Sequence, residues 1–425
     1  MDATAEATRL MVEGRYDEAT QLLMPLCETP AAGLGPWCRL GICLIAQNKP
    51  TNLLGLVELR HAQQGDGLKL LYDTLIWALA VVDHRLILSV VDATPRTSLL
   101  SIVSTYVAGV IAIEAGDAER GIALVKSAAA LGTQAAAHLA SDPYLESIFA
   151  QSRVLEGREA VRQIEATPWD AFFTKLPGLA RHATFHDAVG PPGDEPFVFL
   201  AACDERYLDR FGAMTVRALA ATRARTVLHL HIVDPTPALT SKIDDLRAQC
   251  PTLALRCSSE RVDETWEGYR RASYYACSRL VRLPEILARY RRDVFMWDMD
   301  TGEVKDLRRL VAAMTGHDLG YFEMKHTTPS LICHLAAVYY AHTPAVARLA
   351  EVTAKYVLSK LPEHGFWLLD QSSLFSASRY LQGELPGFRI RDFQEDPGVD
   401  FYDMVQPTGT PKEKQQMRGA VRASA

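Results

Sequence analysis

The stretch FVFLAACDERYLDRFGAMTVRALAATRARTVLHLHIVD, residues 197–234, contains two apolar runs that enclose a segment of helical periodicity. FVFLAACD and VLHLHIVD are short and largely apolar, which is typical of strands buried on both faces. Between them, Leu208, Phe211 and Thr215 recur at the spacing of one helix face. The stretch therefore predicts a strand, a helix and a second strand.

The same alternation continues to residue 300. It predicts a helix over 236–249, a strand over 252–257, a helix around 273–290 and a strand over 294–300. Alternating strands and helices indicate a mainly parallel sheet with helices on both faces. In such sheets, ligands bind at the carboxyl ends of the strands.

Carboxylates follow two of these predicted strands. Asp204 ends the first strand, and VFMWDMD at 294–300 ends in Asp298 and Asp300, the only Asp-x-Asp of the chain. The alternative is a solvated turn without a ligand. Paired carboxylates at a strand end suit a hard divalent cation, Mn²⁺ or Mg²⁺, which would neutralise a diphosphate.

The usual nucleotide-binding signatures of α/β proteins are missing. No G-x-G-x-x-G follows the first strand, and no G-x-x-x-x-G-K-[ST] occurs in the chain. Their absence disfavours a dinucleotide-dependent oxidoreductase and a P-loop NTPase.

The segments VFMWDMDTGEVKDLRRL and ACDERY resemble the D-x-D strand and the D-x-x-Y turn of GT-A glycosyltransferases, most closely the glycogenin and lipopolysaccharide galactosyltransferase type. The resemblance covers about 197–412. It implies a Rossmann-like GT-A domain that transfers a sugar from a nucleotide-diphosphate donor, with a UDP-sugar favoured and Mn²⁺ or Mg²⁺ as cofactor.

The resemblance also implies roles for individual residues. Asp204 and Tyr207 would contact the nucleotide base, Arg279 in ASYYACSRLVRLPEIL the diphosphate, and Asp298 both donor and metal. Asp300 would be a metal ligand, and Asp370 and Gln371 of FWLLDQSSLF would be catalytic residues beside the sugar. In QPTGTPK, Gln406 would occupy the position of the third metal ligand, and Gly409 and Lys412 would lie at the diphosphate.

Each of these residues also has an ordinary structural interpretation. Asp204 and Asp370 precede predicted helices, where an aspartate often serves as an N-cap. Tyr207 would then be a core residue, Arg279 a surface arginine and Lys412 part of a polar tail. His326, His334 and His364 lack metal-ligand spacing and are expected to be structural or solvent-facing.

Two positions depart from the family pattern. Gln406 stands where the family has a histidine, and LAAVYY at 335–340 replaces an Asn-x-Gly stretch. The alternative function is therefore a degenerate transferase domain that acts as a binding or scaffold protein. A third alternative is a nucleotidyltransferase, which would require a Gly-rich basic loop after the first strand. The segment ACDERYLD is not such a loop, so this alternative is disfavoured.

The first 160 residues are predicted to be almost entirely helical. Turn-forming positions recur every 34 residues, at Gly14, Asn48, Val82 and Gly116, and WCRLGICL at 37–44 has the W-x-x-L-G spacing of a tetratricopeptide repeat. This half resembles a tetratricopeptide-like array; a non-repetitive helical domain is the alternative. Because stacked repeats form an extended concave surface, we expect it to hold a protein acceptor or partner.

Composition sets further limits. Hydrophobic content is 48%, charged content 23% and net charge −6, which describes a globular protein without the basic face of a nucleic-acid binder. The 8 cysteines include no C-x-x-C and the N-terminus lacks a secretory pattern, so we expect a cytoplasmic protein. The uncharged stretch 97–113 is too short and polar for a membrane span and predicts a buried helix.

Four segments follow from these patterns. Residues 1–160 form the tetratricopeptide-like helical domain, and 161–196, with its Gly-Pro-Pro-Gly, connect it to the next domain. Residues 197–412 form the GT-A domain, and 413–425 a polar tail.

Overall fold

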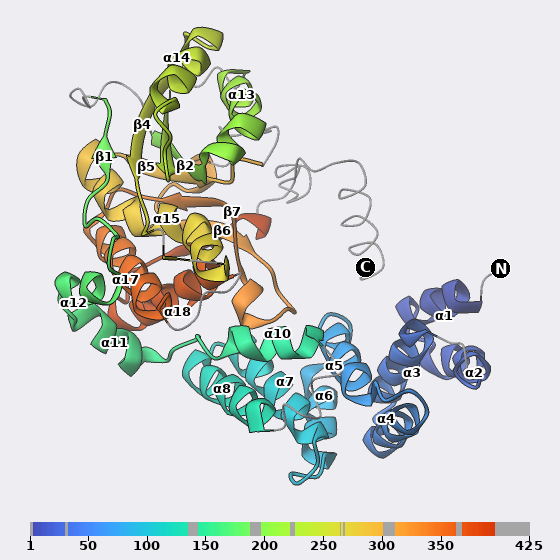
Figure 1. Ribbon diagram of the computed structural model, residues 1–425. Coiled ribbons are helices and arrows are strands. Elements are labelled where there is room, and N and C mark those ends of the chain that lie inside the picture. Colours follow the sequence, from blue (N-terminus) through green and yellow to red (C-terminus); the bar gives the residue numbers. More distant parts are fainter. Residues whose placement is uncertain are drawn as a thin grey trace. The chain divides into compact units, whose positions relative to one another are not determined.

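The computed structural model describes residues 3–29, 33–134, 143–187, 197–221, 226–263, 265–266, 268–300, 311–362 and 368–395. Contacts divide the chain into two units. The helical unit comprises Met1–Leu155 together with Lys325–Pro329, and the sheet unit comprises Glu156–Met324 and Ser330–Ala425 (Figure 1).

The described part of the helical unit consists of helices and the short segments that connect them. The helices are α1 (Ala3–Val12), α2 (Tyr16–Cys27), α3 (Leu34–Ala46), α4 (Pro50–Gln64), α5 (Gly67–Ala78), α6 (His84–Ala93), α7 (Leu100–Glu114), α8 (Ala118–Gln134) and α10 (Pro143–Ser152). The uncharged stretch 97–113 supplies most of α7, whose buried positions include Ile102, Tyr106 and Val110. None of the described helices combines the length and the apolar content that crossing a bilayer requires.

The predicted corners between helices are confirmed at three of the four positions by backbone conformation. Gly14, Asn48 and Gly116 have φ of 75°, 55° and 89°, the left-handed region that ends a helix. The residues five positions after the four predicted corners, Ala19, Leu53, Ile87 and Gly121, are all buried. The 34-residue spacing thus places equivalent residues in the core, while the tetratricopeptide assignment itself stays a prediction.

Helices α7 and α8 approach closely where Gly109 faces Gly121. A Cβ atom added to Gly109 would lie 2.8 Å from the carbonyl oxygen of Gly121, and one added to Gly121 would lie 2.6 Å from that of Gly109. Both glycines are therefore required by packing, because backbone atoms cannot move aside as a flexible side chain can.

Gly109→Ala is expected to destabilise the helical unit by about 1–3 kcal/mol, the usual cost of overpacking. Gly55→Ala is the matched control: Gly55 lies in α4 with nothing within 4 Å of an added Cβ, so alanine should stabilise the helix by about 0.5–1 kcal/mol. Urea unfolding followed by circular dichroism measures both. Equal effects of the two substitutions would refute the close approach of α7 and α8.

The described strands of the sheet unit form one mixed sheet. They are β1 (Thr184–Phe185), β2 (Phe197–Asp204), β3 (Val227–Val233), β4 (Ala254–Glu260), β5 (Asp293–Trp297), β6 (Leu319–Glu323), β7 (Cys333–Tyr340) and β8 (Ile390–Asp392). Their spatial order is β1-β4-β3-β2-β5-β7-β6-β8. Strands β4, β3, β2 and β5 are parallel, as predicted, but β7 pairs antiparallel with both β5 and β6. The described sheet is therefore mixed. Four of its seven strand pairings are parallel, including β6 with β8, and the antiparallel pairings are β1 with β4 and β7 with both β5 and β6.

Helices cover the sheet as the sequence alternation predicted. Helix α13 (Glu205–Ala221) connects β2 to β3, α14 (Leu239–Gln249) connects β3 to β4, and α15 (Gly268–Tyr290) connects β4 to β5. Helix α15 packs on β2, α17 (Pro344–Lys360) packs on α15, and α18 (Leu369–Glu384) packs on β7. Helix α15 thus brings its residues to the centre of the sheet.

The segment 161–196, expected to be a connection, contributes to the sheet unit. It contains most of α11 (Arg158–Ala166), all of α12 (Trp169–Lys175) and β1. Helix α11 packs against α17 and α18, and the Trp169 indole donates a hydrogen bond of 3.1 Å to Glu351. Phe172 is buried and Trp169 is partly buried, and α12 packs on α17, so this segment is part of the packed sheet unit.

Two histidines interrupt the apolar pattern of β3 and are fully buried. His229 is 2.8 Å from the hydroxyls of both Tyr290 and Ser258, and His231 is 2.9 Å from Ser258 and 2.8 Å from Glu260. Burial alone would raise the pKa of Glu260, but His231 and Arg282 lower it to about 2. Each of these buried polar groups has a hydrogen-bond or ion-pair partner inside the protein, so we assign both histidines a structural role.

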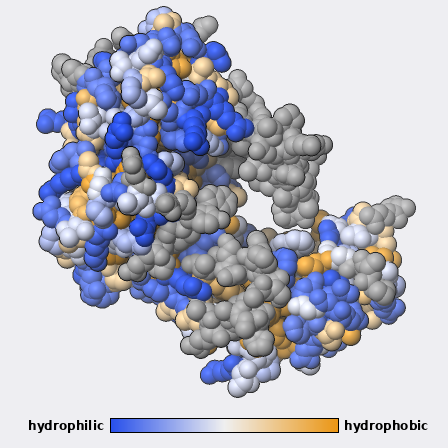
Figure 2. Space-filling model, in the orientation of Figure 1, coloured by the Kyte–Doolittle hydropathy of each residue, from blue (hydrophilic) through white to orange (hydrophobic). Residues whose placement is uncertain are grey.

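Surface character differs between the units. In the view of Figure 2 the sheet unit is mostly hydrophilic, whereas the helical unit shows hydrophobic areas. Among the described residues, every exposed large hydrophobic side chain except Tyr207 belongs to the helical unit, including Val12, Met24, Leu59 and Val81.

Candidate functional site

The order of the strands reverses between β2 and β5. From β2 the chain proceeds outward through β3 to β4, and it then returns through α15 to β5 on the other side of β2. In open α/β sheets, ligands bind at the carboxyl ends of the strands beside such a reversal. Asp204 ends β2, and Asp298 and Asp300 follow β5, so the predicted carboxylates flank this point.

The turn after β5 buries Met299 and leaves Asp298 and Asp300 partly exposed. Met299 is 2% exposed, whereas the side chain of Asp298 is 35% exposed. The backbone of this turn is fixed by two contacts: Asp298 N donates to Ala336 O of β7 (3.1 Å), and the Thr215 hydroxyl of α13 donates to Met299 O (2.8 Å). Contacts with β7 and α13 therefore fix the conformation of the Asp298–Met299–Asp300 turn.

The two carboxylates of this turn interact electrostatically. Burial raises the pKa of Asp300, and the negative charge of Asp298 raises it further. A cation between them would relieve this repulsion and favour the ionised form.

Arg279 of α15 joins Asp298 to a third carboxylate. Its side chain is buried, forms a hydrogen-bonded ion pair with Asp298, and lies 3.4 Å from the carboxylate of Asp370. We call Asp298, Asp300, Asp370 and Arg279 the carboxylate cluster. Three carboxylates face one guanidinium there, so the cluster has an excess of negative charge when all are ionised. The structure thus excludes the interpretation of Arg279 as a surface arginine.

Tyr207 connects the end of β2 to the turn after β5. Its hydroxyl donates to Asp300 Oδ2 at 3.2 Å, and its ring is 41% exposed and packs on Phe211. Burial and the nearby Asp300 raise the pKa of Tyr207 to about 12, so it remains a hydrogen-bond donor at neutral pH. Tyr207 is thus a partly exposed aromatic surface beside the cluster rather than a core residue.

Asp204 has the structural role that its position suggested. Its Oδ1 accepts a hydrogen bond of 2.8 Å from the backbone N of Tyr207, which caps the first turn of α13. The cap positions Tyr207, and it leaves the role of Asp204 in ligand binding a prediction.

Asp370 and Gln371 lie at the start of α18. Asp370 is 7% exposed and accepts from the backbone N of Gln371 at 2.9 Å. Burial raises the pKa of Asp370, whereas Arg279 lowers it. With its amide oriented to satisfy both groups, Gln371 donates to Ser330 O (3.2 Å) and Cys333 O (3.1 Å), so it ties α18 to the start of β7.

His334 of β7 is a neighbour of the cluster that the sequence did not indicate. Burial lowers the pKa of His334, and the charge of Asp298 opposes that shift, which places the imidazole within electrostatic reach of Asp298. From the sequence, His334 lacks metal-ligand spacing and is expected to be structural or solvent-facing. The antiparallel pairing of β5 and β7 brings it near Asp298.

Three predicted site residues, Gln406, Gly409 and Lys412, lie outside the described residues. Pockets on the described part of the sheet unit include one lined by residues such as Trp169 and Pro284 and another lined by residues such as Asp293 and Arg389. Neither is lined by members of the carboxylate cluster.

Comparison with known proteins gives limited information. No protein-family model matches the sequence, and no curated protein matches it. Among solved structures, the chain is similar to the WbbM bifunctional glycosyltransferase in its apo form, with 16% identity and a TM-score of 0.34. The match covers 56% of this chain and 46% of that chain, so it spans less than half of that protein. A likeness of this size carries no argument about activity, and the function proposed below depends on the geometry of the carboxylate cluster.

Proposed function

We propose that the sheet unit transfers a sugar from a nucleotide-diphosphate donor, with a UDP-sugar favoured, in a reaction that depends on Mn²⁺ or Mg²⁺. The observation that carries the proposal is the gathering of Asp298, Asp300, Arg279, Asp370 and Tyr207 where the strand order reverses between β2 and β5. These residues come from four separate segments, and only the fold brings them together.

The donor set at the turn suits a hard divalent cation. Asp298 and Asp300 offer carboxylate oxygens, which Mg²⁺ and Mn²⁺ prefer. Mg²⁺ usually takes one or two protein carboxylates and fills its other positions with water and substrate phosphates. The two aspartates therefore fit a cation that the donor's diphosphate completes, and Gln406 is the proposed third ligand. When bound, the cation would stabilise the charge of the departing nucleoside diphosphate.

The remaining residues of the site would bind and orient the donor. The exposed ring of Tyr207 would contact the base, with Asp204 fixing its position. Arg279 and Lys412 would place positive charge near the diphosphate, and Gly409 would let the backbone approach it closely. Preorganised charge of this kind contributes strongly to catalysis because it stabilises the charge that develops in the transition state. Asp370 and Gln371 would contact the sugar from the start of α18.

A scaffold function is the second candidate. The ion pair between Arg279 and Asp298 engages one of the two proposed metal ligands, and Gln406 is a poorer ligand than histidine. A degenerate site would bind a nucleotide sugar without consuming it. Turnover therefore separates the two candidates, and release of nucleoside diphosphate rather than pyrophosphate separates a glycosyltransferase from a nucleotidyltransferase.

We propose that the helical unit presents the acceptor, which we expect to be a protein. Hydrophobic side chains that include Val12, Met24, Leu59 and Val81 are exposed on this unit, so they are available for contact with an acceptor protein. Docking would raise the acceptor's effective concentration at the sheet unit.

The proposed donor is tested by thermal unfolding of the full chain with a panel of nucleotide sugars and Mn²⁺. A ligand at 100 times its Kd raises the free energy of unfolding by about 2.7 kcal/mol, which shifts Tm by several degrees. We expect a shift with one nucleotide class, dependent on Mn²⁺ and lost in Asp298→Asn. Asp209→Asn, an exposed aspartate of α13 paired with Lys242, is the matched control. A shift that persists in Asp298→Asn would refute the proposed site.

A further inference from the structure

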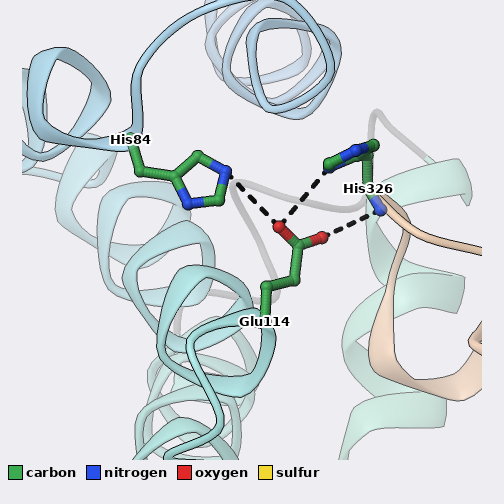
Figure 3. A group of neighbouring side chains, drawn as sticks. All are labelled: His84, Glu114 and His326. Carbon is green, nitrogen blue, oxygen red and sulfur yellow. Dashed lines mark hydrogen bonds and ion pairs between the residues drawn. The ribbon is translucent and has the colours of Figure 1, made fainter.

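A second group of potential metal ligands lies in the helical unit, away from the proposed donor site. His84 begins α6, Glu114 ends α7, and His326 belongs to Lys325–Pro329, the segment that groups with these helices. Their side chains point toward one another (Figure 3), and one ligand atom from each lies within 4.8 Å of the other two. They are the only three His, Cys, Asp or Glu residues so placed in the described part of the chain.

The distances from the two imidazole nitrogens to Glu114 Oε2 are longer than usual hydrogen bonds. His84 Nε2 lies 3.5 Å and His326 Nδ1 lies 3.4 Å from the same oxygen, Glu114 Oε2. Protein N–H···O bonds are usually about 2.7–3.2 Å long. Glu114 Oε2 and His326 Nδ1 are buried atoms without a hydrogen-bond partner. Buried polar atoms without hydrogen-bond partners are rare in folded proteins, so these two atoms are candidate ligand atoms.

The same distances fit ligands around one tetrahedral ion. Nitrogen and oxygen ligands at about 2.0–2.1 Å from a tetrahedral Zn²⁺ lie about 3.4 Å from each other. An octahedral ion at about the same bond length would hold adjacent ligands about 3.0 Å apart. The observed separations of 3.4 and 3.5 Å match the tetrahedral case.

The other oxygen of Glu114 is already engaged. Its Oε1 accepts a hydrogen bond of 2.8 Å from the backbone N of His326. This bond orients the carboxylate so that Oε2 faces both imidazoles, as outer-shell hydrogen bonds commonly do for metal ligands. The His84 and His326 side chains are 34% and 40% exposed, which leaves a route for an ion from solvent.

We propose that His84, Glu114 and His326 bind one Zn²⁺ ion, with a fourth position open to water. Two imidazoles and one carboxylate are a ligand set that zinc accepts, and three protein ligands leave such a position. Bound zinc ties the segment 325–329 to α6 and α7. The site is independent of the proposed sugar transfer.

The test uses the full chain carrying Asp298→Asn and Asp300→Asn, so that the proposed donor site does not contribute metal. After exposure to Zn²⁺ and gel filtration, elemental analysis should give one zinc per chain, and Co²⁺ should give the intense visible spectrum of tetrahedral coordination. His84→Ala and Glu114→Gln should each weaken zinc binding by about 100-fold or more, measured by chelator competition. His61→Ala, which removes an exposed histidine of α4, should leave binding unchanged.

Circular dichroism and the Tm in EDTA show whether the variants fold. Folded His84→Ala or Glu114→Gln protein that retains zinc with unchanged affinity would overturn the proposal. So would the absence of stoichiometric zinc from the folded parent, or a Co²⁺ spectrum of octahedral type. Because the parent lacks Asp298 and Asp300, failure here leaves the proposed sugar transfer untouched, and the reverse also holds.

Discussion

Asp300→Asn is expected to reduce release of nucleoside diphosphate from the donor by about 100- to 1,000-fold, the usual loss when one preorganised electrostatic group is removed. Asparagine keeps the shape of the side chain and its contact with Tyr207, but it removes the charge that would hold the cation. Steady-state assays with the nucleotide sugar that shifts Tm most measure the effect.

The same substitution should not unfold the protein. Burial and Asp298 raise the pKa of Asp300, so the fold disfavours its charge, and a neutral side chain should leave the free energy of unfolding equal or higher. Asp209→Asn should change neither turnover nor stability. Wild-type turnover in Asp300→Asn would show that the turn after β5 is not the metal site.

Arg279→Met is expected to affect both stability and activity. Removing one partner of a buried ion pair costs about 3–5 kcal/mol, because the other partner is left charged in a buried position. Here the affected partner is Asp370, which is 7% exposed and lies 3.4 Å from Arg279. Loss of the guanidinium should also lower kcat by about 100-fold or more if it stabilises the diphosphate.

The double variant Arg279→Met, Asp370→Asn separates these two effects. Removing the uncompensated carboxylate should recover most of the stability, as a double-mutant cycle detects, whereas activity should stay low. Recovery of activity together with stability would mean that Arg279 only balances the charge of Asp370 and that neither residue acts on the donor.

The central strands were predictable because their sequences are continuous apolar runs. FVFLAACD forms β2 over the predicted residues, VLHLHIVD forms β3, and VFMW forms most of β5. The antiparallel pairing of β7 with β5 and β6 was not predictable from such runs. Strands β6 and β8 are short, and which strand neighbours β5 is decided by pairing between distant segments rather than by local sequence.

The helical unit shows the same limit. Repeated turn-formers at Gly14, Asn48 and Gly116 predicted the corners, because a left-handed residue is a local requirement. The proximity of His326 to Glu114 had no local signal, since 212 residues separate them. The spacing of histidines along the chain therefore could not predict that His84, Glu114 and His326 lie together.

The candidate site was predicted in part. The strand-end rule indicated Asp298, Asp300 and Asp204, but the sequence could not show that Tyr207 contacts Asp300 or that Arg279 bridges Asp298 and Asp370. These contacts depend on how α13, α15 and α18 pack around the strand ends. Electrostatic interaction with His334 likewise depends on the register of β7 against β5.

The most direct measurement is the release of nucleoside diphosphate from nucleotide sugars by the purified full chain, in Mn²⁺ and in EDTA. The proposed function predicts release from at least one nucleotide sugar in Mn²⁺, loss of that release in EDTA, and recovery when Mn²⁺ is added back. Release that continues undiminished in EDTA would contradict a metal-dependent site at Asp298 and Asp300. Binding of the donor without release of nucleoside diphosphate under any of these conditions would contradict glycosyl transfer and favour the scaffold function.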